Sequence, residues 1–157
     1  MISKKIIEHK KLNGNKLRIG IVKAQWNNSI TDNLLAGCLK SLSNAGVNKK
    51  NIFVLEVPGS FELPFSAQKI IKEKRVDVVI VLGCLIKGET RHDEYIAQAV
   101  SQGIMRLGLE TGVPVIFGVL TCQIEKQAID RSVGENNHGY FWGEAGVAMG
   151  LLKKNKT

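Results

Sequence analysis

A chain of 157 residues with 44% hydrophobic and 23% charged residues has the composition of one ordinary globular domain, not of a disordered segment. Its formal net charge of +8 comes from lysines that are scattered or near the ends, which indicates a solvated basic surface rather than a nucleic-acid interface. No apolar run approaches transmembrane length and no segment resembles a signal peptide, so no membrane partner is expected. Three widely spaced cysteines favour reduced, buried thiols and a cytoplasmic location.

Strand and helix patterns alternate along the chain. In chain order we expect a strand at 17–24, a helix at 29–45, a strand at 51–57, a helix at 61–74, a strand at 76–86, a helix at 94–109, a strand at 113–120, a short helix at 123–131 and a last helix at 144–153. This alternation predicts a single domain over 1–157 with a three-layer α/β/α, flavodoxin-like fold around a central four-stranded parallel sheet. Residues 1–16 are an N-terminal arm, and a short strand at 4–8 could pair with a neighbouring subunit's sheet.

The most informative segment is GCLIKGETRHDEY at 83–95. It follows the apolar run 78–82, and we expect it to turn through Gly83 and Gly88 and to enter a helix at Thr90. A buried strand, a glycine turn and a polar helix start form the usual ligand edge of a parallel α/β sheet. His92 is one of three histidines in the chain and the only side chain in this segment that titrates near neutral pH when unperturbed. Acid/base chemistry is therefore expected at this edge.

The stretch from Thr90 to Asp93 has two interpretations. Thr90 followed three residues later by Asp93 matches a capping box, so the segment could be only a well-formed helix start and His92 an ordinary surface histidine. A helix start is also a ready anion site, because its free N–H groups and dipole favour negative charge, and Gly88 lets the backbone approach an anion closely. A histidine beside a bound anion suits general acid/base work.

Other strand ends supply candidates with the same ambiguity. Ser60 and Glu62 could be a helix N-cap and a first-turn acid, or they could hold a flat, hydrogen-bonding heterocycle on whose face Trp26 stacks. A tryptophan after a strand could equally pack against its neighbours. Arg131 could be a favourable charge at the end of a short helix or a bidentate phosphate clamp.

Other kinds of site find less support. A nucleophilic cysteine–histidine pair is conceivable for Cys84 or Cys122, but both lie in apolar stretches typical of buried strands. The chain has no cysteine–histidine set with zinc spacing, no Walker loop and no G-x-G-x-x-G segment. The candidate residues therefore favour proton transfer and anion binding without a metal or a covalent intermediate.

Four segments carry a family resemblance. GSFELP (59–64), GCLIKGETRHDEY (83–95), GVPVIFGVLTC (112–122) and EKQAIDR (125–131) follow the order and spacing found in 6,7-dimethyl-8-ribityllumazine synthases, the penultimate enzymes of riboflavin biosynthesis. The chain resembles this family from about residue 17 to residue 152. NHGYFWG at 137–143 and the tryptophan at position 26 resemble fungal-type members more than the common bacterial form.

The resemblance implies a metal- and cofactor-independent transferase that condenses 5-amino-6-(D-ribitylamino)uracil with 3,4-dihydroxy-2-butanone 4-phosphate and releases phosphate and water. It also implies a homo-oligomer whose active sites lie between subunits, with Phe117 and Arg131 supplied by the neighbouring subunit. Carried over by motif, the site residues are Trp26, Ser60, Phe61, Glu62, Cys84, Leu85, Ile86 and Phe117 for the uracil and its ribityl chain, Glu89, Thr90 and Arg131 for the phosphate, and His92 as the acid/base residue.

Two departures from the family pattern stand out. Position 89 is usually small or hydroxylated in the family, and Glu89 should weaken anion binding unless it points away or pairs with Lys87 or Arg91. The stretch 132–137 lacks the glycine–lysine pattern of many shell-forming members, which favours a pentamer over an icosahedral shell.

Two other functions stay in play. The first is a paralogue that binds flavin or lumazine without turnover, with Trp26 as the flavin platform and Glu89 as a sign of a changed phosphate site. The second is a flavodoxin-like electron carrier. That function would need a hydroxyl-rich phosphate loop after the first strand, which Gln25-Trp26-Asn27-Asn28 does not supply.

Overall fold

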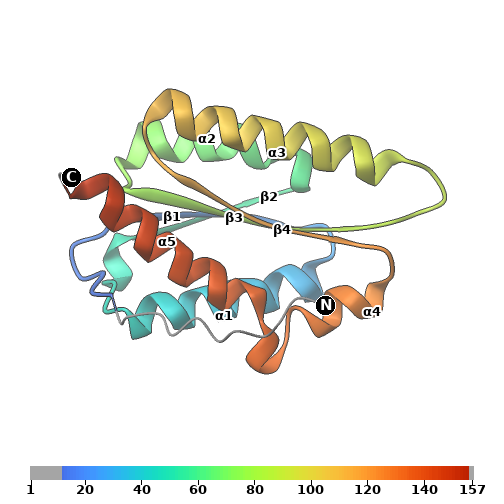
Figure 1. Cartoon of the computed structure of the whole chain (residues 1–157), viewed down its shortest axis with the longest axis horizontal. Coiled ribbons are helices and arrows are strands. Elements are labelled where there is room, and N and C mark those ends of the chain that lie inside the picture. Colours follow the sequence, from blue (N-terminus) through green and yellow to red (C-terminus); the bar gives the residue numbers. More distant parts are fainter. Residues whose placement is uncertain (1–11, 156–157) are drawn as a thin grey trace.

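The computed structural model, which describes residues 12–155, has a parallel four-stranded sheet between two layers of helices (Figure 1). Its strands are β1 (Ile19–Ala24), β2 (Ile52–Val57), β3 (Val78–Ile86) and β4 (Val115–Cys122), in the order β2-β1-β3-β4. The expected three-layer α/β/α, flavodoxin-like fold is confirmed. The strand expected at 4–8 lies outside the described residues.

Both faces of the sheet are covered by helices, each with its own hydrophobic cluster (Figure 1). Helices α2 (Leu63–Lys74) and α3 (His92–Thr111) form the first layer. The second layer consists of α1 (Asn28–Asn44), α4 (Glu125–Asp130) and α5 (His138–Lys154), and three short 3₁₀ turns complete the described elements: η1 (Lys49–Asn51), η2 (Ser60–Glu62) and η3 (Gly134–Asn136). No helix within residues 12–155 combines the length and the apolar character needed to cross a membrane.

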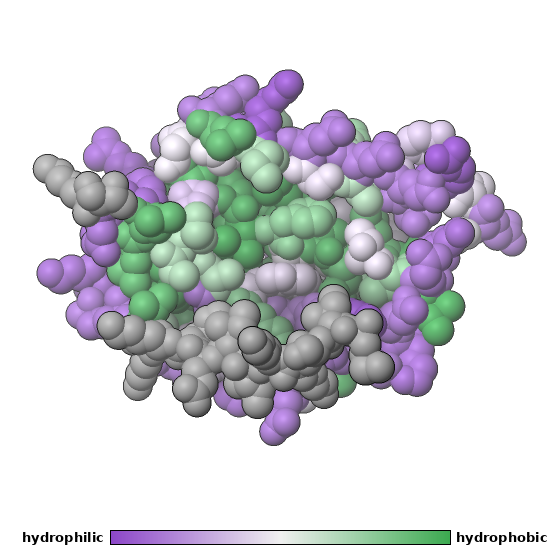
Figure 2. Space-filling view, viewed as in Figure 1, coloured by the Kyte–Doolittle hydropathy of each residue, from purple (hydrophilic) through white to green (hydrophobic). Residues whose placement is uncertain are grey.

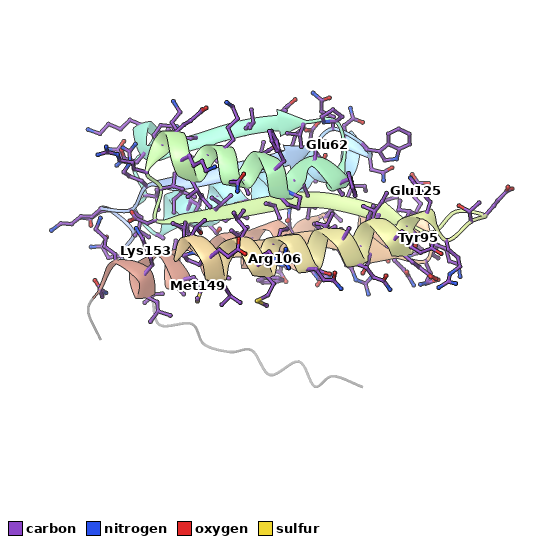
Figure 3. The ribbon with its side chains drawn as sticks, turned by 90° about the horizontal axis from the view of Figure 1, so that it is seen from above. Glu62, Tyr95, Arg106, Glu125, Met149 and Lys153 are labelled. Carbon is purple, nitrogen blue, oxygen red and sulfur yellow. The ribbon has the colours of Figure 1, made fainter. Side chains whose placement is uncertain are left out.

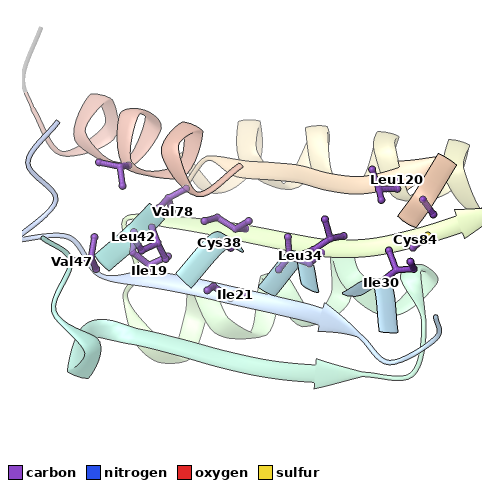
Figure 4. Packing of buried hydrophobic residues seen from close by; sticks show 14 of the residues in the cluster. Ile19, Ile21, Ile30, Leu34, Cys38, Leu42, Val47, Val78, Cys84 and Leu120 are labelled. Carbon is purple, nitrogen blue, oxygen red and sulfur yellow. The ribbon is translucent and has the colours of Figure 1, made fainter. Parts of the chain in front are cut away.

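The central strands β1 and β3 are buried almost throughout, as expected for a parallel sheet between helices, whereas the edge strands β2 and β4 are partly exposed. Along β1 the side chains alternate: Ile19 and Ile21 pack against α1 together with Leu34 and Cys38 (Figure 4), whereas Val22 belongs to the cluster under α2 and α3. Every residue of β1 is buried. The central part of the sheet is therefore closed to ligands, and ligand-binding groups are expected beyond its strand ends.

Strand β3 corrects the prediction of a turn at Gly83. The strand continues through Gly83 to Ile86, with Gly83 paired to Val119 of β4. A Cβ atom at Gly83 would lie only 2.5 Å from Oγ of Ser60. The glycine is therefore explained by the close approach of the β2–α2 connection to the strand, not by a turn.

Helix α5 begins at His138, six residues before the predicted start at Glu144. The segment 138–143 contains two glycines and looked non-helical by propensity. These glycines face α1: a Cβ at Gly139 would lie 2.0 Å from the carbonyl oxygen of Leu34, and one at Gly143 would lie 1.8 Å from Oγ of Ser41. Close packing of α5 on α1 thus overrides the local propensity.

Candidate active site

The carboxyl ends of three neighbouring strands gather most of the predicted site residues. Trp26 follows β1, the turn η2 with Ser60, Phe61 and Glu62 follows β2, and the loop 87–91 follows β3. Glu62 and Tyr95, the latter in the first turn of α3, both lie toward this end of the molecule (Figure 3). The predicted ligand edge therefore exists as one surface.

The turn between β1 and α1 presents Trp26 to solvent. Its side chain is 73% exposed, which is at odds with a tryptophan packed against its own chain. The backbone N–H of Trp26 donates to the carbonyl of Pro58 (3.0 Å), and Asn27 adopts the left-handed conformation (φ 59°) while its Nδ2 donates to the carbonyl oxygen of Cys84 (3.0 Å). Asn27 was missed at the sequence level, although asparagine tolerates this conformation better than most residues.

The η2 turn uses its polar groups internally. Gly59, not Ser60, is the N-cap residue, and Oε2 of Glu62 accepts a hydrogen bond from the Gly59 N–H (3.0 Å). Ser60 is buried against Gly83, whereas Phe61 is exposed. The Ser60 N-cap prediction is wrong because the residue is needed to pack on β3, while Glu62 does support the start of the turn as expected.

Strand β3 runs past the end of β1. Pairing with β1 ends at Leu82, which lies opposite Lys23, so the next residues border the β1–α1 turn on that side. There Cys84 is buried, Leu85 and Ile86 are half-buried, and the Cys84 carbonyl accepts from Asn27. Beyond the pairing with β1, the backbone of this segment is within reach of a ligand bound over the turn.

The cysteine thiols are buried and unpaired, as predicted. Burial, together with the neighbouring Cys122, raises the pKa of Cys84 to about 12, and burial raises the pKa of Cys122 although Arg131 opposes the shift. Since the thiolate is the nucleophile, neither thiol is activated at neutral pH. This electrostatic environment disfavours the cysteine–histidine hypothesis.

Helix α3 begins at His92, so Thr90 lies outside it. The N-cap is Arg91, whose side chain makes no capping hydrogen bond and whose Nε donates to Oε2 of Glu94 (2.8 Å), so the predicted Thr90–Asp93 capping box is not formed. Thr90 makes only a long contact, its Oγ1 accepting from the His92 N–H at 3.4 Å. The prediction of a helix start at Thr90 is therefore wrong by two residues, and His92 is exposed at the first residue of the helix.

Glu89 lies exposed in the same loop. Among the ion pairs of residues 12–155, none joins Glu89 to Lys87 or Arg91, because Arg91 pairs with Glu94 instead. The carboxylate is therefore not neutralised by the two cations that could have offset it.

Phe117 and Arg131 lie on the β4 side of the molecule. Phe117 pairs with Val81 in mid-strand, five positions before the end of β4 at Cys122, so its Cα lies roughly 16 Å short of the strand end. Arg131 caps α4 and donates from Nη1 to the Gln127 carbonyl (3.0 Å). Within one chain Phe117 is therefore not part of the surface around Trp26.

His138 lies next to Arg131 in the structure. His138 begins α5, and its N–H donates to the Arg131 carbonyl (2.8 Å). Burial and the nearby Arg131 lower the pKa of His138, which keeps its imidazole neutral at pH 7. Within the described residues, no group of three histidine, cysteine or acidic side chains is arranged to hold a metal ion.

The comparisons with known proteins agree on one family. The family model described as 6,7-dimethyl-8-ribityllumazine synthase matches residues 16–154. Proteins of that name are similar over most of the chain: one from Pyricularia oryzae is 40% identical, covering 90% of both chains, and one from Prochlorococcus marinus subsp. pastoris is 40% identical, covering 96% of this chain and 98% of its own. One from Flavobacterium psychrophilum is 45% identical over 87% of this chain and 71% of its own. The chain thus belongs to the 6,7-dimethyl-8-ribityllumazine synthase family, and it is a transferase with lumazine synthase activity in riboflavin biosynthesis.

Proposed function

We propose that two copies of this chain build each active site, where 5-amino-6-(D-ribitylamino)uracil condenses with 3,4-dihydroxy-2-butanone 4-phosphate. The observation that carries this proposal is the separation of Phe117 from the ligand edge of its own chain, since β4 and β2 are opposite edges of the sheet. One copy would supply the surface at the ends of β1, β2 and β3, and the next copy would supply Phe117 and Arg131.

The first copy would bind most of the pyrimidine substrate. The exposed indole of Trp26 offers a flat platform for its ring, and the turn with Ser60, Phe61 and Glu62 borders that platform. The backbone of the segment Cys84, Leu85 and Ile86 would bind the ribityl chain. Aromatic stacking and backbone hydrogen bonds together would hold a heterocycle in one orientation.

The phosphate would bind between the copies. Thr90 and the backbone of the 87–91 loop lie just before the N-terminus of α3, where the helix dipole favours an anion. Arg131 of the second copy would add a bidentate clamp, and its guanidinium retains donors beyond the one used on Gln127. Phe117 would cover the pyrimidine ring.

His92 would move the protons. In the condensation, the amine of the pyrimidine attacks the ketone carbonyl, phosphate leaves, and ring closure with loss of water gives the lumazine. His92 is exposed at the start of α3 beside the phosphate loop, within reach of both reactants. Because only two bound reactants and proton transfers are required, proximity would supply much of the rate.

The surface supports a ring of copies. Apolar side chains gather between α3 and α5 on the face bordered by β4, called here the β4 face (Figure 2); they are Met105, Leu109, Phe117, Met149 and Leu152. Met149 lies on one long side of the molecule and Glu62 on the opposite side (Figure 3), where Phe61 and Phe65 are also exposed. Two different apolar surfaces on opposite sides fit head-to-tail contacts that close into a ring. Among assemblies built from such contacts, we favour a fungal-like pentamer over an icosahedral shell.

Mixing two inactive variants tests the shared site. His92→Ala and Arg131→Ala should each lose most turnover, measured by lumazine absorbance. The two variants are mixed in equal amounts, unfolded and refolded, so that their subunits exchange. Roughly a quarter of the sites would then combine an intact His92 from one copy with an intact Arg131 from the next, and about that share of wild-type activity should return. No recovery, with refolded wild type active, would place both residues in one copy and refute the proposal. Refolded His92→Ala alone is the matched control.

Riboflavin binding at Trp26 belongs to the same proposal. An exposed indole is suited to stack on an isoalloxazine ring, and tight binding should quench Trp26 fluorescence.

The proposal also includes a single domain over 1–157, supported by the match over 16–154. It includes a cytoplasmic location, supported by three free cysteines.

A further inference from the structure

A buried lysine lies directly before the candidate platform. Lys23 is the fifth residue of β1 and is only 3% exposed, on the same face of the strand as Ile19 and Ile21. At those two positions the face is filled by aliphatic side chains that pack under α1. An ammonium group at the third position is costly to bury, so the charge must be offset and its presence asks for a specific reason.

Two carboxylates from different elements enclose the Lys23 ammonium. Nζ forms ion pairs with Asp32 of α1 and with Oε1 of Glu56 on β2, the latter at 3.3 Å. Burial by itself would lower the pKa of Lys23, but the hydrogen bonds and charges of Asp32 and Glu56 outweigh it and raise the pKa. Lys23 is therefore charged at neutral pH, and it joins the first turns of α1 to the ends of β1 and β2.

The same cluster reaches the residue before Trp26. Oε2 of Glu56, the oxygen not bonded to Lys23, lies 3.4 Å from Nε2 of Gln25. The backbone N–H groups of Gln25 and Trp26 donate to the carbonyls of Val57 and Pro58, so this turn is also tied to the end of β2. The Lys23 cluster thus links the backbone that carries the indole to β2 and α1.

We propose that Lys23, held by Asp32 and Glu56, is a positioning residue that sets the orientation of the Trp26 platform. The indole itself is 73% exposed and makes few contacts of its own, so its direction depends on the backbone of the turn. Asn27 holds that turn in the left-handed conformation, which is unfavourable for a non-glycine residue and persists where the surroundings over-determine it. The Lys23 cluster holds the turn on the side of α1, and the hydrogen bond from Asn27 to the Cys84 carbonyl holds it on the side of β3. The inference rests on the proposed role of Trp26 under the pyrimidine ring.

The test uses Lys23→Met in a Trp142→Phe background, so that Trp26 is the only tryptophan of the two in the chain. Two readouts need no turnover: the fluorescence anisotropy of Trp26 in the ligand-free protein, and its quenching by the pyrimidine substrate alone. We expect lower anisotropy and about tenfold weaker pyrimidine binding, because a misplaced platform loses oriented contacts. Under turnover, KM for the pyrimidine should rise while KM for the phosphate substrate stays unchanged.

A matched control separates positioning from stability. Ile21→Ala removes a buried side chain from the same strand and face, two residues earlier, and should lower stability without changing either Trp26 readout. If Lys23→Met leaves both readouts unchanged, raises both KM values in parallel, or behaves like Ile21→Ala, the proposal is wrong. Should Lys23→Met fail to fold, Glu56→Gln takes its place as the test variant, because the half-exposed Glu56 side chain is easily replaced. For Glu56→Gln we expect about threefold weaker pyrimidine binding. Wild type that binds the pyrimidine but shows no turnover would refute the proposed function and leave this test valid.

Discussion

Glu89 stands in the loop that would receive the phosphate, and its charge is not balanced by Lys87 or Arg91. We predict that Glu89→Ala lowers KM for 3,4-dihydroxy-2-butanone 4-phosphate about two- to fivefold, the scale of a solvent-exposed charge interaction. KM for the pyrimidine should not change. Steady-state kinetics with each substrate varied in turn would measure both values.

The control for this prediction is another exposed glutamate. Glu73, near the end of α2, is remote from the loop, and Glu73→Ala makes the same change in net charge. A drop in KM with both variants would assign the effect to overall charge, and an unchanged or raised KM in Glu89→Ala would show that the carboxylate points away from the phosphate.

Buried thiols make stability depend on alkaline pH. Burial raises the pKa of Cys38 to about 12, whereas an unfolded cysteine titrates near ~8.5. Between these pH values the native state keeps a proton that the unfolded state has lost, so the free energy of unfolding falls as pH rises, by about 1.4 kcal/mol per pH unit for this thiol. The contribution is fully present below pH ~8.5.

Urea unfolding of wild type and Cys38→Ala between pH 9 and 11 checks this dependence. The stability difference between the two proteins should shrink with rising pH, because the variant lacks the titrating group. Ile21→Val is the matched control, since it alters the same core without a titratable group and should keep a constant difference from wild type. Parallel curves for wild type and Cys38→Ala would contradict the prediction.

At the scale of elements, α1 and α5 approach so closely that glycine is required between them. Ala is the better helix former, yet a Cβ at Gly139 would lie 2.0 Å from the Leu34 carbonyl oxygen, a backbone atom that cannot rotate away. We predict that Gly139→Ala lowers the free energy of unfolding by about 2 kcal/mol or more through forced separation of the helices. Chemical denaturation followed by circular dichroism would measure it.

Ala148→Gly provides the comparison within the same helix. Ala148 is exposed on α5, so the change should cost only the intrinsic helix propensity of about 1 kcal/mol. If Gly139→Ala proved neutral or stabilising, the close contact between α1 and α5 would be excluded as the reason for that glycine.

At the scale of the whole molecule, the exposed β4 face is the proposed contact between copies. Met105 is 65% exposed and central to that surface, and a charge there would be buried without a partner in any complex that covers it. We predict that Met105→Lys gives a folded but dissociated protein with little turnover. Light scattering should then fall from about 86 kDa, five chains of 17.2 kDa, toward the mass of one chain.

Ser43→Lys is the control, because it adds the same charge to an exposed position on α1. It should leave the mass and the turnover of wild type unchanged. A megadalton particle for wild type would replace the pentamer with a shell, and an unchanged mass for Met105→Lys would remove the β4 face from the assembly.

Local patterns in the sequence predicted much of the ligand edge. Strand β3 includes the first four residues of GCLIKGETRHDEY and α3 begins within it at His92, so His92 and the 87–91 loop lie at the edge of the sheet. The helix start was misplaced because Thr90 is not the N-cap: the N-cap is Arg91, and no side chain caps the helix there. A periodic pattern places helix ends only to within one or two residues.

Apolar periodicity and motif spacing are properties of neighbouring residues. For that reason the sequence alone predicted the α/β class and the ligand edge, and its four collinear motifs predicted the family. Tertiary contacts were needed to show that Ser60 packs against Gly83, that Lys23 is enclosed by Asp32 and Glu56, and that Phe117 lies away from Trp26. These facts depend on contacts between segments that are distant in the chain, and burial and close packing set them after the elements have formed.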